Sequence, residues 1–277
     1  MRPAPRRRIR DDRGPTSRRC RRPPGITLEQ TAGPLSLAAA AHRERSAAIG
    51  ITSWAMIEWS CEAVVFDLDG VLVDSAACVE RHWRRWAAKH GLDGGEIMRF
   101  AHGRPTAETI RLVAPHLPAD GEAARLDASE AFDTEGVIAI PGAAELVRSL
   151  PPNAWAIATS RTRAVALTRL RHTGLPLPAV LITADDVKRG KPNPEGYMLA
   201  ARRLSMAPDR CVVVEDAPAG VDAARAAGMR VVGLTTTHSR AELKGADVTA
   251  AQLVDIQVSA SDTRPAGGLT VCITEAS

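Results

Sequence analysis

Short apolar stretches recur along the chain from residue 62 onward, with segments of helical period between them. Five of these stretches lack polar alternation: residues 63–67, 155–159, 180–183, 211–215 and 230–234. Strands that are buried on both faces of a parallel sheet show this pattern. Because these stretches alternate with helical segments, they predict an α/β fold built on a doubly wound parallel sheet.

The helical segments between these strands carry start and stop signals. One helix is predicted to begin at Pro141. A second has Asn193 as its N-cap and Pro194 in its first turn, where the missing N–H of proline costs no hydrogen bond. A third runs from about residue 219 to 227 and ends at Gly228, a residue type suited to a C-terminal cap.

Residues 77–138 interrupt this alternation with helical periods and no convincing strand. The segment is too long for a simple crossover between two strands, so it predicts a small helical domain inserted into the core. Since the insertion starts just after the first strand, we expect it to cover the carboxyl edge of the sheet as a cap. Trp83 and Trp86 lie one helical turn apart, and we expect them to form the core of this cap rather than a ligand platform.

The predicted α/β core comprises residues 56–76 and 139–255, and residues 256–277 follow it as a C-terminal tail. Residues 1–55 precede it as a leader rich in Arg and Pro, which we expect to be disordered. This leader fits neither a secretory signal nor an organelle transit peptide. One alternative is that translation begins at Met56; a weaker one is that the leader's arginines contact RNA.

The basic character of the chain is confined to this leader. Residues 1–55 hold 12 Lys and Arg against 4 Asp and Glu, whereas the whole chain holds 36 against 32. The remaining residues, with 24 basic and 28 acidic side chains, have a net charge of −4. They therefore give no electrostatic argument for nucleic-acid binding.

The cysteine pattern and the hydropathy of the chain indicate in which cellular compartment the protein is expected. The five cysteines are scattered without a Cys-x-x-Cys pair, which favours a reducing compartment, and we expect the cytoplasm. The longest apolar runs, such as residues 35–41, are far too short to span a bilayer, so no membrane association is expected. We expect a monomer or a weak dimer.

Four polar motifs lie where consecutive predicted strands end, at the edge of an open parallel sheet where ligands bind. These motifs are Asp67-Leu-Asp69, Thr159-Ser160, Lys191 and Glu215-Asp216. Neighbouring carboxylates repel each other, so a fold keeps them where a cation or a reaction uses them. Carboxylates suit a hard divalent cation, and the hydroxyl and ammonium groups suit phosphoryl oxygens. The set indicates Mg²⁺-assisted phosphoryl transfer.

Three phrases carry a family resemblance: FDLDGVLVDS at residues 66–75, GKPNP at 190–194 and EDAPAG at 215–220. They resemble hydrolases of the haloacid dehalogenase (HAD) superfamily that have a helical cap, in the branch of sugar and polyol phosphatases and β-phosphoglucomutases. The resemblance covers residues 63 to 234 approximately. It implies a Rossmann-like core, Mg²⁺ as cofactor and phosphoric monoester hydrolysis.

The resemblance also implies roles for the motif residues. Asp67 is expected to attack phosphorus and form an aspartyl-phosphate, while Asp69 serves as general acid and then as general base. Mg²⁺ is expected to bind Asp67, the Asp69 carbonyl and Asp216, with Glu215 nearby. The phosphoryl group is expected to be held by three groups: the Thr159 hydroxyl, the Ser160 amide and Lys191.

Substrate choice is expected to come from the cap, where His102 and Arg104 lie in a loop that faces substrate in the related enzymes. The resemblance points to a small sugar or polyol phosphate, such as glycerol phosphate or a deoxyhexose phosphate. A structural role in the cap is the alternative for both residues. A β-phosphoglucomutase-type phosphomutase and a non-catalytic sugar-phosphate-binding regulator remain alternatives for the whole protein.

Overall fold

The computed structural model describes residues 55–101, 103–260 and 268–275. All of them belong to one compact unit, Thr52–Ser277. The predictions for the leader concern residues outside the described ones, apart from Ala55. None of the helices in the described ranges has the length and apolar character needed to cross a membrane.

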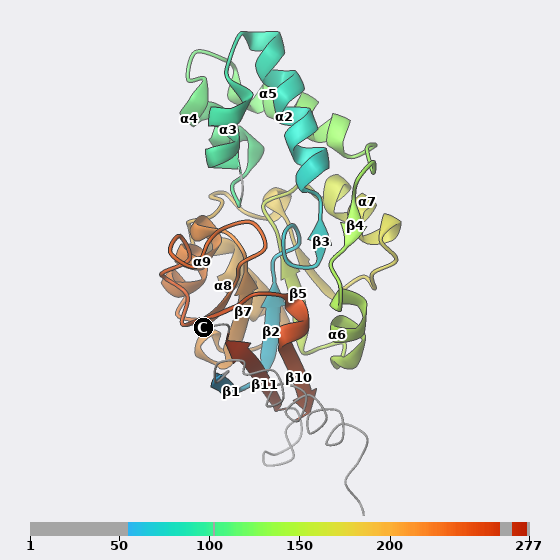
Figure 1. The fold of residues 1–277 in the computed structure, drawn as a ribbon, viewed down its shortest axis with the longest axis vertical. Coiled ribbons are helices and arrows are strands. Elements are labelled where there is room, and N and C mark those ends of the chain that lie inside the picture. The colour runs from blue at the N-terminus through green and yellow to red at the C-terminus, as the bar shows by residue number, and fades with distance from the viewer. Residues whose placement is uncertain (1–54, 102, 261–267, 276–277) are drawn as a thin grey trace, which may run out of the picture. The chain divides into compact units, whose positions relative to one another are not determined.

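The main sheet in the described part of the chain has six strands in the order β6-β5-β2-β7-β8-β9, all parallel to their neighbours. Figure 1 labels its central strands β5, β2 and β7. The bounds are Ala63–Phe66 for β2, Trp155–Ala158 for β5, Val180–Ile182 for β6, Cys211–Glu215 for β7, Arg230–Leu234 for β8 and Val248–Ala250 for β9. The predicted doubly wound sheet is thus confirmed, with β9 added. Strand order reverses between β2 and β7, and such switch points open a crevice at the carboxyl ends of the strands.

Both faces of the sheet are buried because successive side chains of a strand point to opposite faces. In the central strand β2, Val64 and Phe66 belong to one apolar cluster, and Ala63 and Val65 to the other. Helices α8 and α9 cover the Ala63 face, and α6 and α7 lie on the opposite face. Their bounds are Ala143–Ser149 for α6, Arg163–His172 for α7, Glu195–Leu204 for α8 and Pro218–Ala226 for α9.

A second sheet completes the Phe66 face. Strand β1 (Ala55–Cys61) pairs antiparallel with β11 (Leu269–Glu275), which pairs antiparallel with β10 (Ile256–Ala260). The buried side chains of β11 alternate along the strand and join the same apolar cluster as Phe66. The segment separated as a C-terminal tail therefore supplies two strands of the folded unit.

The predicted helix boundaries shift by one or two residues, as boundaries commonly do. Helix α8 begins at Glu195, so Pro194 rather than Asn193 occupies the N-cap position. Asn193 still acts at this end, because its Oδ1 accepts the Glu195 N–H at 3.1 Å. Gly228 follows α9 with φ of +79°, a conformation that glycine adopts without strain.

The inserted segment forms a helical cap (Figure 1), joined to the core through the short strands β3 (Val73–Asp74) and β4 (Ile138–Ala139). Its helices are α2 (Ala76–His90), α3 (Gly94–Ala101), α4 (Thr106–Val113) and α5 (Ala119–Glu130). Trp83 and Trp86 are buried in its apolar cluster, with ring centroids 5.5 Å apart in an edge-on arrangement. Their predicted role as cap core is confirmed.

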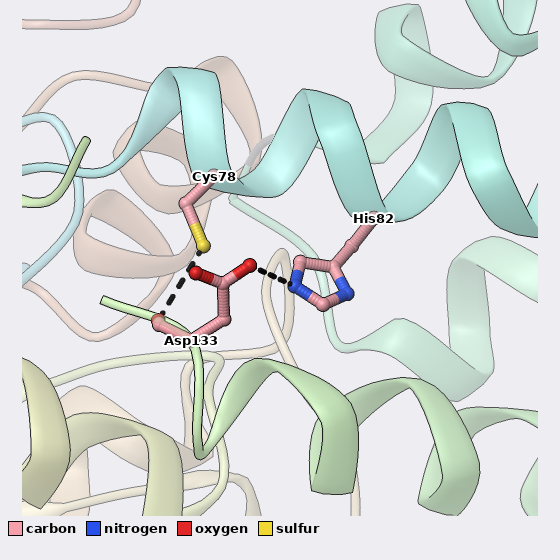
Figure 2. A group of neighbouring side chains, drawn as sticks. All are labelled: Cys78, His82 and Asp133. Carbon is pink, nitrogen blue, oxygen red and sulfur yellow. Dashed lines mark hydrogen bonds and ion pairs between the residues drawn. The ribbon is translucent and has the colours of Figure 1, made fainter. Parts of the chain in front are cut away.

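The base of the cap is held by a polar cluster of Cys78, His82 and Asp133 (Figure 2). His82 Nε2 lies 2.8 Å from Asp133 Oδ2, and the Cys78 thiol lies 3.6 Å from the Asp133 carbonyl oxygen. Arg81 donates to the same carboxylate at 2.7 Å, and the Glu135 N–H donates to its other oxygen at 3.0 Å. These hydrogen bonds account for the cluster and fasten the first helix of the cap to the segment that returns to the core.

Replacing Asp133 by Asn is expected to lower the free energy of unfolding by about 1–2 kcal/mol, because hydrogen bonds to a charged acceptor are lost. The hydrogen bond from Arg81 holds the pKa of Asp133 well below its usual range. The stabilisation is therefore complete above the usual carboxyl pKa and disappears as pH falls through the lowered value. Denaturant unfolding of wild type and variant should show a difference at pH 7 that shrinks in strong acid. The exposed pair of Arg111 and Asp120 gives a control, since Asp120→Asn should change little.

Candidate active site

Asp67 directly follows strand β2 and therefore lies at the switch point between β2 and β7. Its N–H continues the sheet by donating to the Val214 carbonyl at 3.0 Å. Lys191 Nζ donates to Asp67 Oδ1 at 2.7 Å and to Glu215 Oε1 at 2.6 Å. Side chains that are 124 and 24 residues apart in the sequence thus meet at one ammonium group, as the four-motif arrangement predicts.

Glu215 is completely buried, and its carboxylate is fully occupied. Besides Lys191, Oε1 accepts the Tyr197 hydroxyl at 2.9 Å, while Oε2 accepts the N–H groups of Asp216 and Ala217 at 2.8 and 2.9 Å. A Cβ on Gly220 would lie 1.6 Å from Oε1, so only glycine fits there. Glu215 therefore anchors Lys191 and the turn after β7.

Asp67, Glu215 and Asp216 bring carboxylate oxygens within 4.8 Å of one another, a grouping able to hold a cation. No donor among the described residues bonds Asp67 Oδ2 or Asp216 Oδ1. Thr237 Oγ1 donates to Asp216 Oδ2 and orients that side chain. One free oxygen on each of two buried carboxylates fits a hard divalent cation, which binds through oxygen.

Burial and mutual repulsion disfavour the charged forms of these acids. Burial raises the pKa of Asp67 to about 7, with Lys191 opposing the shift and the charge of Glu215 adding to it. Burial, followed by the charges of Glu215 and Asp67, holds the pKa of Asp216 well above its usual range. Burial alone would lower the pKa of Lys191, but Asp67 and Glu215 raise it well above its usual value, so the ammonium stays charged.

Asp69 has different partners from Asp67. Strand β2 ends at Phe66, so both acids lie beyond it and the alternation of side chains along a strand does not place them on one side of the backbone. Ser75 Oγ donates to Asp69 Oδ1 at 2.8 Å, while Arg161 Nε donates to Oδ2 at 3.1 Å and Arg169 Nη1 to the same oxygen. Burial raises the pKa of Asp69, but the guanidiniums of Arg169 and Arg161 outweigh it and bring the pKa below its usual value.

Sequence reasoning missed both arginines. Arg161 directly follows the Thr159-Ser160 motif, and this adjacency was the available signal. Arg169 lies two helical turns further on in α7, where it resembles the exposed basic residues of that helix until its burial is known.

Thr159 and Ser160 follow β5 and lie beneath the cap loop that leads into α4. Ser160 Oγ donates to the Gly103 carbonyl at 2.9 Å, and the Gly190 N–H donates to Glu108 Oε1 at 2.9 Å. Thr159, Ser160 and Lys191 line a cavity of about 20 Å³ here, which is room for roughly one water molecule. The cap is thus seated on two of the motif loops.

The two cap residues of the predicted site are not tested by these contacts. His102 lies outside the described residues. Arg104 is half-buried and makes no hydrogen bond or ion pair within the described ranges. The structure therefore brings Asp67, Lys191, Glu215 and Asp216 into contact, while the substrate role of His102 and Arg104 stays a prediction.

The comparisons with known proteins agree on one family. Residues 61–228 match the model of haloacid dehalogenase-like hydrolases. Hexitol phosphatase A of Escherichia coli (strain K12) is 44% identical over 204 residues, which covers 72% of this chain and 94% of that protein. Glycerol-1-phosphate phosphohydrolase 2 of Saccharomyces cerevisiae is 34% identical over 200 residues, covering 67% and 80%. A crystal structure of a hydrolase from Pseudomonas syringae superimposes with a TM-score of 0.62 at 29% identity, covering 70% and 94%.

Proposed function

This chain belongs to the haloacid dehalogenase-like hydrolases, and we propose that it is a Mg²⁺-dependent phosphatase that hydrolyses a small sugar or polyol phosphate through an aspartyl-phosphate on Asp67. The observation that carries the proposal is the buried Asp67 carboxylate, which shares Lys191 with Glu215 and has one oxygen without a donor among the described residues. The names of the relatives support the substrate class, since they are a hexitol phosphatase and a glycerol-1-phosphate phosphohydrolase.

The reaction divides into two displacements at phosphorus, which replace one slow hydrolysis by two easier steps. In the first, an Asp67 oxygen bonds to phosphorus as the ester P–O bond breaks. Asp69 first takes up a proton from solvent, against the charges of Arg169 and Arg161, and gives it to the leaving oxygen. In the second, Asp69 takes a proton from water, the water oxygen bonds to phosphorus, and the bond to Asp67 breaks. Phosphate leaves and both carboxylates return to their starting forms.

The negative charge of the phosphoryl group would be stabilised by hydrogen-bond donors and a cation of this chain. Lys191 stays charged at neutral pH and lies beside the nucleophile, so it offsets repulsion between Asp67 and the phosphoryl oxygens. The Thr159 hydroxyl and the Ser160 N–H are the further proposed donors. Asp67, the Asp69 carbonyl and Asp216 would hold Mg²⁺, which supplies charge neutralisation to the phosphoryl oxygens when bound.

The cap supplies water exclusion and substrate choice. A cavity of about 20 Å³ between the cap loop and the Thr159-Ser160 turn is far below the hundreds of Å³ of an ordinary ligand pocket. A phosphorylated sugar therefore enters after the cap has moved away from the Ser160–Gly103 contact. Arg104 and His102 are the proposed cap contacts to the sugar or polyol part.

The test is a panel of phosphorylated sugars and polyols assayed for inorganic phosphate, with Mg²⁺ and with EDTA. We expect phosphate release from hexitol, glycerol or deoxyhexose phosphates that EDTA abolishes and Mg²⁺ restores. Formation of an isomeric sugar phosphate without release of phosphate would show a phosphomutase instead. Binding of a sugar phosphate without turnover would show a non-catalytic regulator.

Replacing Asp216 by Asn is expected to raise the Mg²⁺ concentration for half-maximal activity by about tenfold or more, because changes around a metal site cost about 10–100-fold in affinity. Titration of activity with Mg²⁺ measures this change. Asp222 on α9 is exposed and lies outside the site, so Asp222→Asn is the matched control. An unchanged Mg²⁺ requirement in Asp216→Asn would contradict the metal assignment.

A further inference from the structure

Asp69 is connected to the cap through two buried arginines. Arg161 and Arg169 both donate to Asp69 Oδ2. With its other terminal nitrogen, Arg169 donates to Glu130 Oε2 at 3.0 Å. Glu130 is the last residue of cap helix α5, whereas Arg161 follows β5 and Arg169 lies on α7. The contacts therefore run from the loop after β2, through two guanidiniums of the core, to the cap.

The burial of this cluster is close to complete. Arg169 and Glu130 are 1% exposed, and Arg161 is 5% exposed. Removing charges from water carries a large desolvation cost, and apolar side chains of similar volume serve stability equally well or better. Two guanidiniums balanced by Asp69 and Glu130 are thus a costly way to fill space. This cost indicates a role other than packing.

The hydrogen bonding of the cluster is incomplete. Among the described residues, three of the four buried polar side-chain atoms without a hydrogen bond belong to it: Glu130 Oε1, Arg161 Nη1 and Arg169 Nε. Arg161 Nη1 lies 3.7 Å from Glu130 Oε2, an ion pair too long for a hydrogen bond. Because buried polar atoms are nearly always bonded, the unpaired atoms of Arg161, Arg169 and Glu130 are hydrogen-bonding capacity that this arrangement leaves unused.

We propose that Arg161, Arg169 and Glu130 are positioning residues, which hold the Asp69 carboxylate in place for proton transfer and tie its orientation to the seating of the cap. The inference rests on the proposed role of Asp69 as general acid and base. Proton transfer requires the donor group within hydrogen-bond reach of the reacting oxygen, and Asp69 takes its orientation from these guanidiniums and Ser75.

Arg169 and Glu130 have distinct parts in this arrangement. Arg169 contacts Asp69 and Glu130 with separate nitrogens of one planar fork, which a lysine ammonium cannot reproduce. Glu130 balances the second positive charge and holds the far edge of Arg169. Without that charge, Asp69 is the one carboxylate of the described residues that still forms ion pairs with both guanidiniums, and Arg169 no longer links it to the cap.

The experiment compares two substrates in Arg169→Lys and Glu130→Gln. p-Nitrophenolate leaves phosphorus without a proton, whereas the alkoxide of glycerol phosphate needs one. The ratio kcat/KM covers substrate binding and the steps up to the aspartyl-phosphate, so it includes the acid step and excludes the later base step. We expect kcat/KM to fall by about 10²-fold on glycerol phosphate and to change little on p-nitrophenyl phosphate. Arg163→Gln is the matched control, because Arg163 pairs with Asp186 instead, and both substrates should be unaffected.

A double variant separates positioning from general damage. If Glu130 acts through Asp69, then adding Glu130→Gln to Asp69→Asn lowers kcat/KM on glycerol phosphate no further than Asp69→Asn alone. Additive losses, or equal losses on the two substrates, would overturn the inference. Glu130→Gln keeps the side-chain shape and carries the test if Arg169→Lys does not fold. A wild-type protein that releases phosphate from no ester of the sugar and polyol panel would instead refute the proposed phosphatase, and the inference with it.

Discussion

Replacing Asp67 by Asn is expected to reduce kcat by about 10⁴-fold or more, the range seen when a covalent nucleophile is removed. The amide keeps the size of the side chain but cannot form the acyl-phosphate bond that the two-step reaction needs. Phosphate release from the best substrate of the panel measures the loss. A variant that keeps wild-type turnover would contradict the role of Asp67.

The matched control is Asp74→Asn. Asp74 is exposed, lies in the same motif and accepts the Ala76 N–H at 3.1 Å, a hydrogen bond that Asn also accepts. We expect this variant to keep wild-type turnover. The comparison separates the loss of a nucleophile from a general disturbance of the loop after β2.

Asp67→Asn should not destabilise the metal-free protein. The direction of this expected change in stability follows from the raised pKa of Asp67. In the folded state burial raises the pKa of Asp67 from 3.8 to about 7. A carboxyl whose pKa is higher in the folded than in the unfolded state binds its proton more tightly when folded. The free energy of unfolding therefore falls as pH rises from about 4 to 7, where the unfolded state has already lost this proton. At pH 8 without Mg²⁺ the variant is therefore expected to unfold at an equal or higher temperature than wild type.

Replacing Lys191 by Met is expected to affect both stability and turnover. The variant leaves Asp67, Glu215 and Asp216 buried without their shared counter-charge, and breaking a buried ion pair from one side costs about 3–5 kcal/mol. Loss of the ammonium beside the phosphoryl group should lower kcat by about 10²–10³-fold, as for other charge-stabilising donors. Denaturant unfolding and phosphate release measure the two effects.

The pH dependence of this variant distinguishes charge from packing. Protonation of Asp67 and Asp216, whose pKa values are already raised by burial, relieves the repulsion that Lys191 normally offsets. The stability gap between Lys191→Met and wild type should therefore be widest near pH 8 and narrow toward pH 5. A gap that stays constant over this range would show that the lost methylene packing, not the lost charge, is responsible. Lys188→Met, in the same loop but at an exposed position, is the control.

Local sequence signals predicted most of the fold because burial on both faces and turn chemistry are short-range properties. The five apolar runs became β2, β5, β6, β7 and β8, and the inserted helices became the cap. Strands β10 and β11 were missed. Strand β11 pairs with β1 through a long-range contact, and β10 joins the sheet only through β11. The alternation of Leu269, Val271 and Ile273 was the one local sign of a half-buried strand there.

By itself the sequence determined the fold class, the family and the positions of Asp67, Lys191 and Asp216 at the strand ends. Only the tertiary structure decided which charges neutralise one another: Lys191 with Asp67 and Glu215, and Asp69 with Arg161 and Arg169. The physical reason is that apolar periodicity records which face of a segment is buried, whereas an ion pair depends on which segments meet. Burial then sets how strongly each pair shifts its pKa values, and burial is a property of the assembled fold.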